Sequence, residues 1–221
     1  MKEDLIGNWY YSDGNKIDSQ FRFYKDSIVF INSFGWKSSL KWRIDSDKIY
    51  TSYLNESGPT YKFKLLNDKQ TLRIEFTNDD LSESVNFIKA KNSNDFYFQN
   101  IIGLEIELPT KESEFEHIDS SHYLNFNIYA GYDVNNLVVK TDSSTDLNNL
   151  TKEVAEFKEN SRDELKKHIK FNLIADKKIS KSKIDSIKNL LKKTSIELIL
   201  RTYQIEKLDD INDSNWIQVQ E

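Results

Sequence analysis

Hydrophobic and polar residues alternate along the first hundred residues of the chain. From Leu5 to Phe98 the period is two, and short groups containing Gly, Pro, Asn or Asp interrupt the pattern. This arrangement is typical of half-buried antiparallel strands joined by tight turns. The alternating sets are Phe21 and Phe23; Leu40, Trp42 and Ile44; Ile49, Thr51 and Tyr53; Tyr61, Phe63 and Leu65; Leu72, Ile74 and Phe76; and Phe96 and Phe98.

The spacing of these sets predicts eight or nine short strands in a meander. Many of the alternating residues are aromatic, and one face of the sheet must bury them. Closure removes exposed strand edges and gives large side chains an interior. We therefore expect an antiparallel β-barrel or a curled meander.

The pattern changes after residue 98. Residues 99–122 look like a linker, because Ile101-Ile102-Gly103 ends the apolar alternation, Leu108-Pro109 favours extended backbone, and Lys111 to His122 is mostly charged. Two short strands are then expected around Leu124 to Ile128 and Leu137 to Val139.

Two amphipathic helices alternate with two further strands in the rest of the chain. Ser143, Ser144 or Thr145 is the expected N-cap of the first helix. The expected inward residues are Leu147, Leu150, Val154 and Phe157 in the first helix and Ile184, Ile187, Leu190 and Leu191 in the second, which begins at Ser180. The expected strands contain Ile169, Phe171 and Leu173, and then Ile196, Leu198 and Leu200.

The order of these elements is ββαβαβ, which indicates a sheet covered by helices on one face. The fold class is therefore α+β. We expect a β-domain over residues 1–103, an αβ domain over 104–205 and an acidic tail over 206–221, which either stays mobile or docks through Trp216.

Composition restricts the chemistry. The 221 residues include no Cys and a single Met, at position 1, so disulfides, thiolate ligands and a thiol nucleophile are excluded. No signal peptide or membrane-spanning segment is visible, so the expected location is cytoplasmic, or periplasmic if a leader precedes this sequence in the natural protein. The net charge of −5 falls in the second half, which argues against nucleic acid as a partner.

The opening Gly7-Asn8-Trp9 resembles the Gly-x-Trp motif at the start of lipocalin-like β-barrels. In that family the tryptophan begins the first strand and plugs one end of the barrel. The resemblance covers about a hundred residues and implies a complete or reduced barrel with an apolar interior able to hold a small molecule.

The second half resembles the soluble domain of the ExbD/TolR family, which contains partners of proton-driven envelope motors. The matching segments are Glu107-Leu108-Pro109, the strand Phe171 to Ala175 followed by Asp176, and Ile196 to Thr202. Family members carry a transmembrane helix with an ionisable carboxylate, which this sequence lacks. The resemblance therefore implies dimerisation or partner binding and not energy transduction.

No catalytic motif or metal site is predicted. His117 and His122 lie near acidic residues, but a charged linker is the favoured interpretation, and His168 is interpreted as a helix C-cap. Nucleophile motifs and Gly-rich phosphate loops are absent. The lysines of the second helix are interpreted as a solvated face, with an anion site as the alternative, and Asp176 as a residue that shapes a turn.

The aromatic residues of the β-domain are the strongest indication of function. Two interpretations stay open, because a small barrel fills with side chains to be stable, whereas an incompletely filled one holds a ligand. The candidate ligand-lining residues are Trp42, Tyr53, Tyr61, Phe63 and Phe76.

The leading functional hypothesis is a non-catalytic interaction or scaffold module. It would self-associate as a homodimer, or it would bind or neutralise a protein partner. The alternative is a carrier of a small apolar ligand in the β-domain. Neither hypothesis requires a cofactor, and under neither hypothesis is the protein an enzyme.

Overall fold

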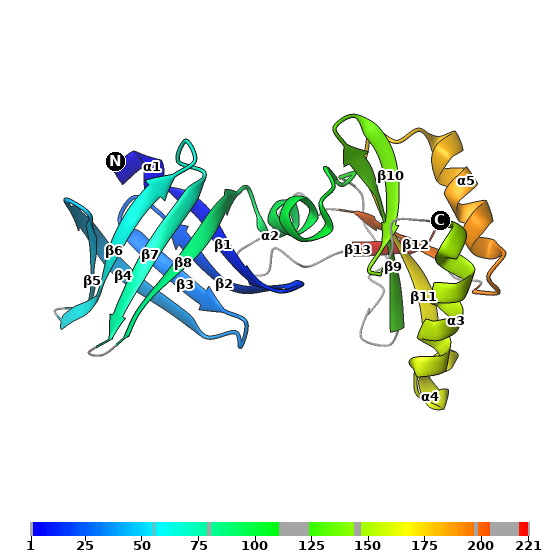
Figure 1. The fold of residues 1–221 in the computed structure, drawn as a ribbon, viewed down its shortest axis with the longest axis horizontal. Coiled ribbons are helices and arrows are strands. Elements are labelled where there is room, and N and C mark those ends of the chain that lie inside the picture. The colour runs from blue at the N-terminus through cyan, green and yellow to red at the C-terminus, as the bar shows by residue number, and fades with distance from the viewer. Residues whose placement is uncertain are drawn as a thin grey trace. The chain divides into compact units, whose positions relative to one another are not determined.

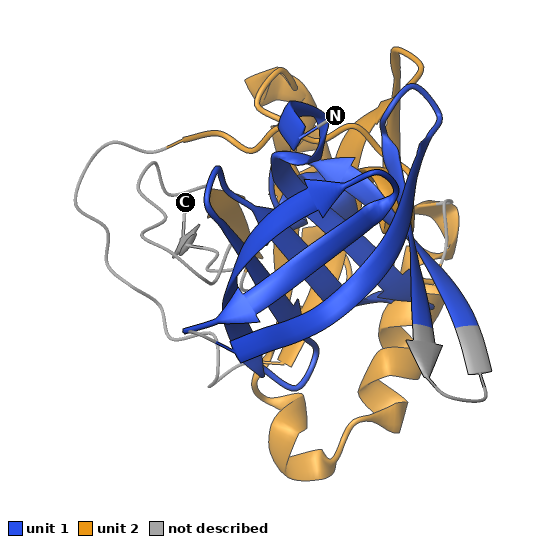
Figure 2. Cartoon of the chain, turned by 90° about the vertical axis from the view of Figure 1, so that its left-hand side faces the viewer, with its two compact units in different colours: residues 1–97 blue, residues 98–221 orange. Residues whose placement is uncertain are grey.

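The chain forms two compact units, Met1–Tyr97 and Phe98–Glu221, shown in different colours in Figure 2. The computed structural model describes residues 2–54, 56–78, 81–110, 124–143, 147–196, 199–203 and 217–220. The first unit is a β-barrel and the second combines a sheet with helices (Figure 1). The α+β fold class is confirmed.

Eight antiparallel strands form the barrel of the first unit (Figure 1). Each strand pairs with the next along the chain, and β8 pairs back with β1 to close the barrel. The expected closure is therefore confirmed. The strands are β1 (Gly7–Asp13), β2 (Lys16–Phe23), β3 (Ser27–Asn32), β4 (Lys37–Asp45), β5 (Lys48–Tyr53), β6 (Glu56–Leu66), β7 (Thr71–Asn78) and β8 (Leu81–Ala90).

A short helix, α1 (Lys2–Leu5), closes one end of the barrel. Leu5 and Trp9 are completely buried there, and the indole Nε1 of Trp9 donates a hydrogen bond to the Leu5 carbonyl at 2.7 Å. Lys89 Nζ donates to the Asp4 carbonyl at 2.9 Å and lies 5.0 Å from the Trp9 ring. These contacts fill and cap this end of the barrel interior.

Phe96 and Phe98 do not form the expected strand. Phe96 ends the helix α2 (Ser93–Phe96), and Phe98 lies in the π-helix η1 (Tyr97–Ile102). The Asn92 side chain caps α2 by accepting from the Asp95 amide at 2.9 Å, which favours a helical turn over an extended strand. The Phe96 ring stacks on Tyr10 of β1, with centroids 5.3 Å apart.

The second unit contains a five-stranded sheet in the order β10-β9-β11-β12-β13. Its strands are β9 (Leu124–Asp133), β10 (Asn136–Thr141), β11 (Ile169–Ala175), β12 (Ile199–Tyr203) and β13 (Ile217–Gln220). β11 runs parallel to both β9 and β12, whereas β10 and β13 are antiparallel to their neighbours. The ββαβαβ order is therefore present, with β13 as an addition.

The helices of this unit are η3 (Leu147–Asn149), α3 (Leu150–Asn160), α4 (Asp163–Lys166) and α5 (Lys181–Lys192). Leu150 and Val154 of α3 and Ile184, Ile187 and Leu191 of α5 share one core with the sheet. Leu147, Phe157 and Leu190 pack against that core. Figure 1 shows α3 and α5 on the same side of the sheet, so the expected one-sided cover is confirmed.

Two details at the helix ends differ from expectation. Helix α3 begins after Asn149, which makes no side-chain capping bond; Ser143 precedes it, and Ser144 and Thr145 lie outside the described residues. His168 is not the C-cap of a long helix, because α3 ends at Asn160 and the short α4 follows. The backbone carbonyl of His168 instead accepts a hydrogen bond from Leu124 of β9 at 3.0 Å.

Residues 99–110 are not an extended linker. The apolar alternation continues beyond Gly103, and Leu104, Ile106 and Leu108 are all buried. Glu105 forms an antiparallel bridge with Tyr132 of β9. The linker interpretation was wrong for this segment because every second side chain enters the core; the remainder, residues 111–122, lies outside the described residues.

The C-terminal residues include one strand that the sequence interpretation did not anticipate. β13 pairs with β12 from Leu200↔Gln220 to Tyr203↔Ile217, so residues 217–220 extend the sheet. The expected docking residue, Trp216, lies outside the described residues, as do residues 206–215.

Candidate functional site

Large side chains fill the end of the barrel next to α1. The rings of Phe23 and Trp42 meet edge to face, with centroids 5.0 Å apart, and the Trp42 indole donates to the Tyr24 carbonyl at 2.9 Å. Lys2 Nζ lies 4.8 Å from the centre of the Trp42 ring. This half of the interior therefore consists of packed core.

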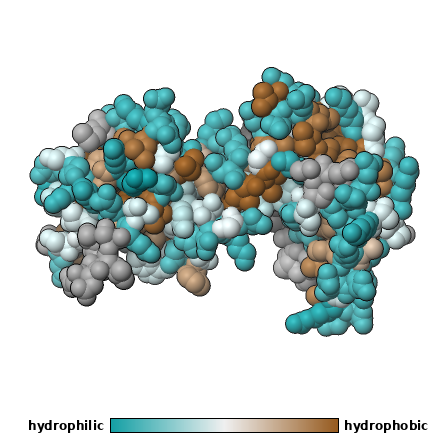
Figure 3. All heavy atoms as spheres, viewed as in Figure 1, coloured by the Kyte–Doolittle hydropathy of each residue, from teal (hydrophilic) through white to brown (hydrophobic). Residues whose placement is uncertain are grey.

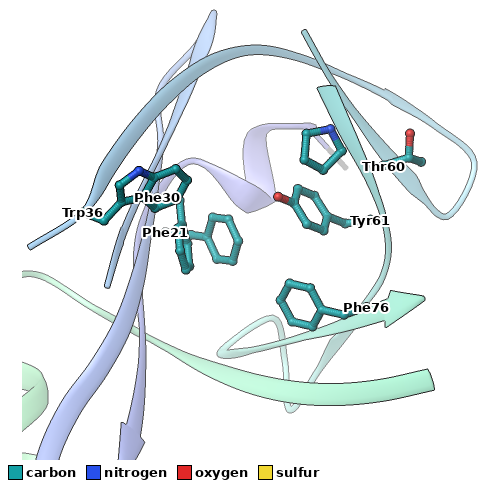
Figure 4. Close-up of a pocket in the computed structure, with 7 residues that line it drawn as sticks. Phe21, Phe30, Trp36, Thr60, Tyr61 and Phe76 are labelled. Carbon is teal, nitrogen blue, oxygen red and sulfur yellow. The ribbon is translucent and has the colours of Figure 1, made fainter. Parts of the chain in front are cut away.

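The opposite half of the barrel contains an open cavity of about 450 Å³ (Figure 4). The lining residues are Phe21, Phe30, Trp36, Pro59, Thr60, Tyr61 and Phe76. A smaller hollow of about 160 Å³ shares most of this lining and adds Ile28, Ser38 and Leu40. Ligand cavities in proteins commonly measure about 300–1,000 Å³, so this one has room for a small molecule.

The rings of the cavity come from opposite sides of the barrel. Figure 4 shows Phe21, Phe30 and Trp36 on one side, facing Tyr61 and Phe76 on the other. Neighbouring rings support one another within each side: Phe21 and Phe30 lie 4.9 Å apart by centroid, and Tyr61 and Phe76 lie 5.6 Å apart edge to face. The folded barrel therefore forms two aromatic walls, which touch where Phe21 meets Tyr61 edge to face with centroids 5.8 Å apart.

The Tyr61 hydroxyl is the main polar group that enters the cavity. It points toward the space between the two walls in Figure 4, and no residue that the structure describes forms a hydrogen bond with it. Burial raises the pKa of Tyr61 above its ordinary value of 10.0. The hydroxyl therefore stays protonated at neutral pH and can both donate and accept a hydrogen bond.

The turn between β3 and β4 fixes Trp36 at the mouth of the cavity. The Asn32 side-chain oxygen accepts from the backbone amides of Phe34, at 3.1 Å, and Trp36, at 2.9 Å. Gly35 supplies the positive φ of 78° that this turn needs. The Trp36 ring then lies 5.9 Å from Phe30 by centroid.

The structure brings two of the five candidate ligand-lining residues to the cavity, namely Tyr61 and Phe76. Trp42 and Phe63 are buried in the packed core instead. Tyr53 was wrongly assigned to the interior: its side chain is 60% exposed, because β5 ends at this residue.

Sequence reasoning missed several lining residues. Phe21 belonged to an alternating set but was not a lining candidate, and Phe30, Trp36, Pro59 and Thr60 were not considered. The available signal was the alternation of Ile28 with Phe30, followed by the turn residues Asn32 and Gly35.

The structure assigns no chemistry to the other candidate residues. Among the described residues, no three His, Asp or Glu side chains form a group suited to a metal ion, and His117 and His122 lie outside that part of the chain. Of the α5 region lysines, Lys177 pairs with Glu107 at 2.6 Å. Lys188 is half-buried, and the remaining lysines of this region are exposed. The lysines of the α5 region are Lys177, Lys178, Lys181, Lys183, Lys188, Lys192 and Lys193. No helix in the described ranges is long and apolar enough to cross a bilayer.

No protein-family model, curated protein or solved structure matches this chain. The closed eight-stranded barrel is lipocalin-like in general shape. The resemblance of the second unit to the ExbD/TolR soluble domain has no support from these comparisons.

Proposed function

We propose that this protein binds a small, mainly apolar, ring-containing molecule in the open end of its barrel. The observation that carries the proposal is the cavity of about 450 Å³ between two aromatic walls. A barrel that served only as a scaffold would gain stability by filling this space with side chains, as it does at the end next to α1.

The chemistry of the walls indicates the class of ligand. Aromatic rings bind apolar and aromatic groups through burial and edge-to-face contacts. The Tyr61 hydroxyl adds one position for a hydrogen bond, which a ligand with a single carbonyl or hydroxyl group would occupy. The residues that line the cavity include no charged side chain, and a highly ionised ligand would need one.

A titration with the neutral fluorescent probe N-phenyl-1-naphthylamine tests this proposal, with native mass spectrometry against a panel of fatty acids and aromatic compounds as the second measurement. Wild-type protein should bind the probe, and a bound ligand should raise the melting temperature. A ligand at a hundredfold excess over its dissociation constant adds about 2.7 kcal/mol of stability.

Ser38→Phe places a ring in the smaller hollow and should weaken probe binding by about tenfold or more, because the added side chain occupies ligand space. Ser39→Phe is the matched control. It adds the same ring at the neighbouring exposed position, which alternates to the outer face of β4. Equal binding by both variants and wild type, or no binding by any compound, would exclude the cavity as a ligand site.

A second candidate function is protein association through the αβ unit. β10 lies at the edge of its sheet, with β9 as its partner among the described strands, and such an edge is a template for strand addition. A homodimer or a partner protein would pair there. Val138→Lys should then shift a concentration-dependent dimer to monomer in sedimentation analysis; a wild-type protein that stays monomeric and captures no partner contradicts this candidate.

A further inference from the structure

Exposed apolar side chains gather at the open end of the barrel. Phe34 and Trp36 in the β3–β4 turn are 92% and 58% exposed. Tyr53, the last residue of β5, and Leu54 in the β5–β6 turn are 60% and 77% exposed. The other described surfaces carry fewer such side chains, and the face of the barrel drawn in Figure 3 is mainly hydrophilic, with apolar residues in small separate groups.

The strand pairing places these two turns at the same end. β4 pairs antiparallel with both β3 and β5, so the chain enters β4 from the first turn and returns along β5 to the second. Figure 1 shows both turns at the end of the barrel opposite α1. Trp36 on one side and Pro59 on the other line the cavity, so its mouth opens between the two hairpins.

The β3–β4 turn is built to present its apolar residues. The Asn32 side chain accepts two hydrogen bonds within this turn. In addition, the backbone amide of Gly35 donates a hydrogen bond to the Asn32 carbonyl at 2.9 Å. The Ser33 hydroxyl also donates to Asp18 at 3.3 Å. Phe34 is therefore held outside the barrel by an ordered turn.

The arrangement matches the interface of a lipid bilayer. At each turn a highly exposed apolar residue, Phe34 or Leu54, is accompanied by an amphipathic ring, Trp36 or Tyr53. Trp and Tyr favour the headgroup level of a bilayer, while Phe and Leu favour the region below it. A stable protein interface would instead need a continuous patch of roughly 800 Å² on each partner.

The charges around the mouth specify the kind of lipid. The described charged residues on the strands and turns at this end are Asp13, Lys16, Asp18, Lys37, Glu56 and Glu83. Acidic residues outnumber basic ones in this set, so anionic lipids would gain no electrostatic attraction. A zwitterionic surface fits this end better.

We propose that the open end of the barrel docks on a neutral phospholipid surface, with Phe34 and Leu54 inserted among the lipids. The cavity mouth would then face the bilayer, and an apolar ligand would enter without crossing water. The entry route rests on the proposed ligand function, whereas the docking itself depends only on the two turns.

Flotation of the full chain with phosphatidylcholine vesicles tests the docking. Wild-type protein should float with the vesicles, and Phe34→Ser combined with Leu54→Ser should lower the bound fraction by about tenfold or more, because apolar side chains supply the binding. Val134→Ser is the matched control, since Val134 is 81% exposed at the β9–β10 turn of the other unit. Binding should persist at high salt and should not increase with added phosphatidylserine.

Probe binding in vesicle-free buffer separates the two proposals. The double variant should keep wild-type affinity for N-phenyl-1-naphthylamine, because neither residue lines the cavity. The docking proposal is overturned if wild-type protein does not float, if the double variant floats equally well, or if binding requires phosphatidylserine. It is also overturned if the double substitution abolishes a dimer rather than vesicle binding, which would identify a second copy of the chain as the occupant.

Discussion

The Asp176 carboxylate accepts a hydrogen bond from the backbone amide of Glu107 at 2.7 Å, across 69 positions of sequence. Its other oxygen accepts from the Lys178 amide at 2.7 Å, and the Asp176 side chain is buried. The interpretation of Asp176 as a turn-shaping residue is therefore confirmed. The same carboxylate also fixes the segment 104–108 beside β9 and β11, which explains why these residues belong to the core.

Asp176→Ala should destabilise the αβ unit by at least about 2 kcal/mol, because two backbone amides lose a charged acceptor. Asp176→Asn should cost less, since one amide oxygen remains. Hydrogen exchange of β11 peptides measures the effect in this unit alone. Asp185→Ala on the exposed face of α5 is the control and should stay within about 0.5 kcal/mol of wild type; equal protection in all variants would contradict the prediction.

Gly131 in β9 has a steric role in the same contact. A Cβ atom at this position would lie 2.5 Å from Ile106 Cγ1 and 2.7 Å from the Glu105 carbonyl oxygen. The backbone oxygen cannot move away cheaply, so Gly131→Ala should cost about 1–3 kcal/mol. Faster hydrogen exchange around Tyr132 with unchanged probe binding by the barrel is the expected result; unchanged exchange there would show that the segment adjusts freely.

The buried Lys170 should make the free energy of unfolding depend on pH. It is fully buried in β11, and burial lowers its pKa from 10.5 to about 8. Between pH 8 and 10.5 the unfolded chain therefore binds more protons at this lysine than the folded chain does. The free energy of unfolding consequently rises with pH across that window, and this gain disappears as the pH falls back to 8. One proton contributes a slope of at most about 1.4 kcal/mol per pH unit.

Lys170→Met should remove this contribution. Urea unfolding at a series of pH values, followed by hydrogen exchange of β11, compares the variant with wild type and with Lys167→Met, an exposed control outside the strand. The wild type and the control should gain protection from pH 8 to 10, and the Lys170 variant should gain less. Parallel pH profiles for all three proteins would refute the assignment.

The barrel was predictable because the inward parity holds over long stretches of its strands, although the register shifts after Tyr11 in the β1–β2 pair and after Tyr50 in the β5–β6 pair. Sequence alternation placed Phe21, Phe63 and Ile74 in the interior, and all three are buried. Tyr53 shows the limit of this reasoning: it has the same parity as Ile49 and Thr51, which are buried, but it lies at the end of its strand. Parity gives the direction of a side chain, whereas burial also depends on what stands opposite.

The cavity was harder to predict than the barrel. The aromatic residues at the two ends of the barrel look alike in sequence. Trp42 nevertheless packs against Phe23 at one end, while Trp36 borders the cavity at the other. The difference comes from α1, which brings Leu5 into one end of the barrel beside Trp9 of β1. Whether a ring lines a hollow depends on such three-dimensional neighbours, and strand period does not encode them.

The final prediction concerns the hydroxyl of Tyr61. Tyr61→Phe keeps the ring and the aromatic wall but removes the hydrogen-bonding group in the cavity. A matched pair of ligands, 2-acetylnaphthalene and 2-ethylnaphthalene, differs mainly in the carbonyl group. The substitution should weaken binding of the acetyl compound by about 2- to 12-fold, the value of one hydrogen bond, and leave the ethyl compound unaffected. Because burial raises the Tyr61 pKa above 10.0, the preference of the wild-type protein for the acetyl compound over the ethyl compound should stay constant from pH 6 to 9.

Fluorescence displacement of N-phenyl-1-naphthylamine measures both affinities. An equal loss for both ligands would mean that the substitution disturbs the wall, and no loss for either would remove Tyr61 from the binding site.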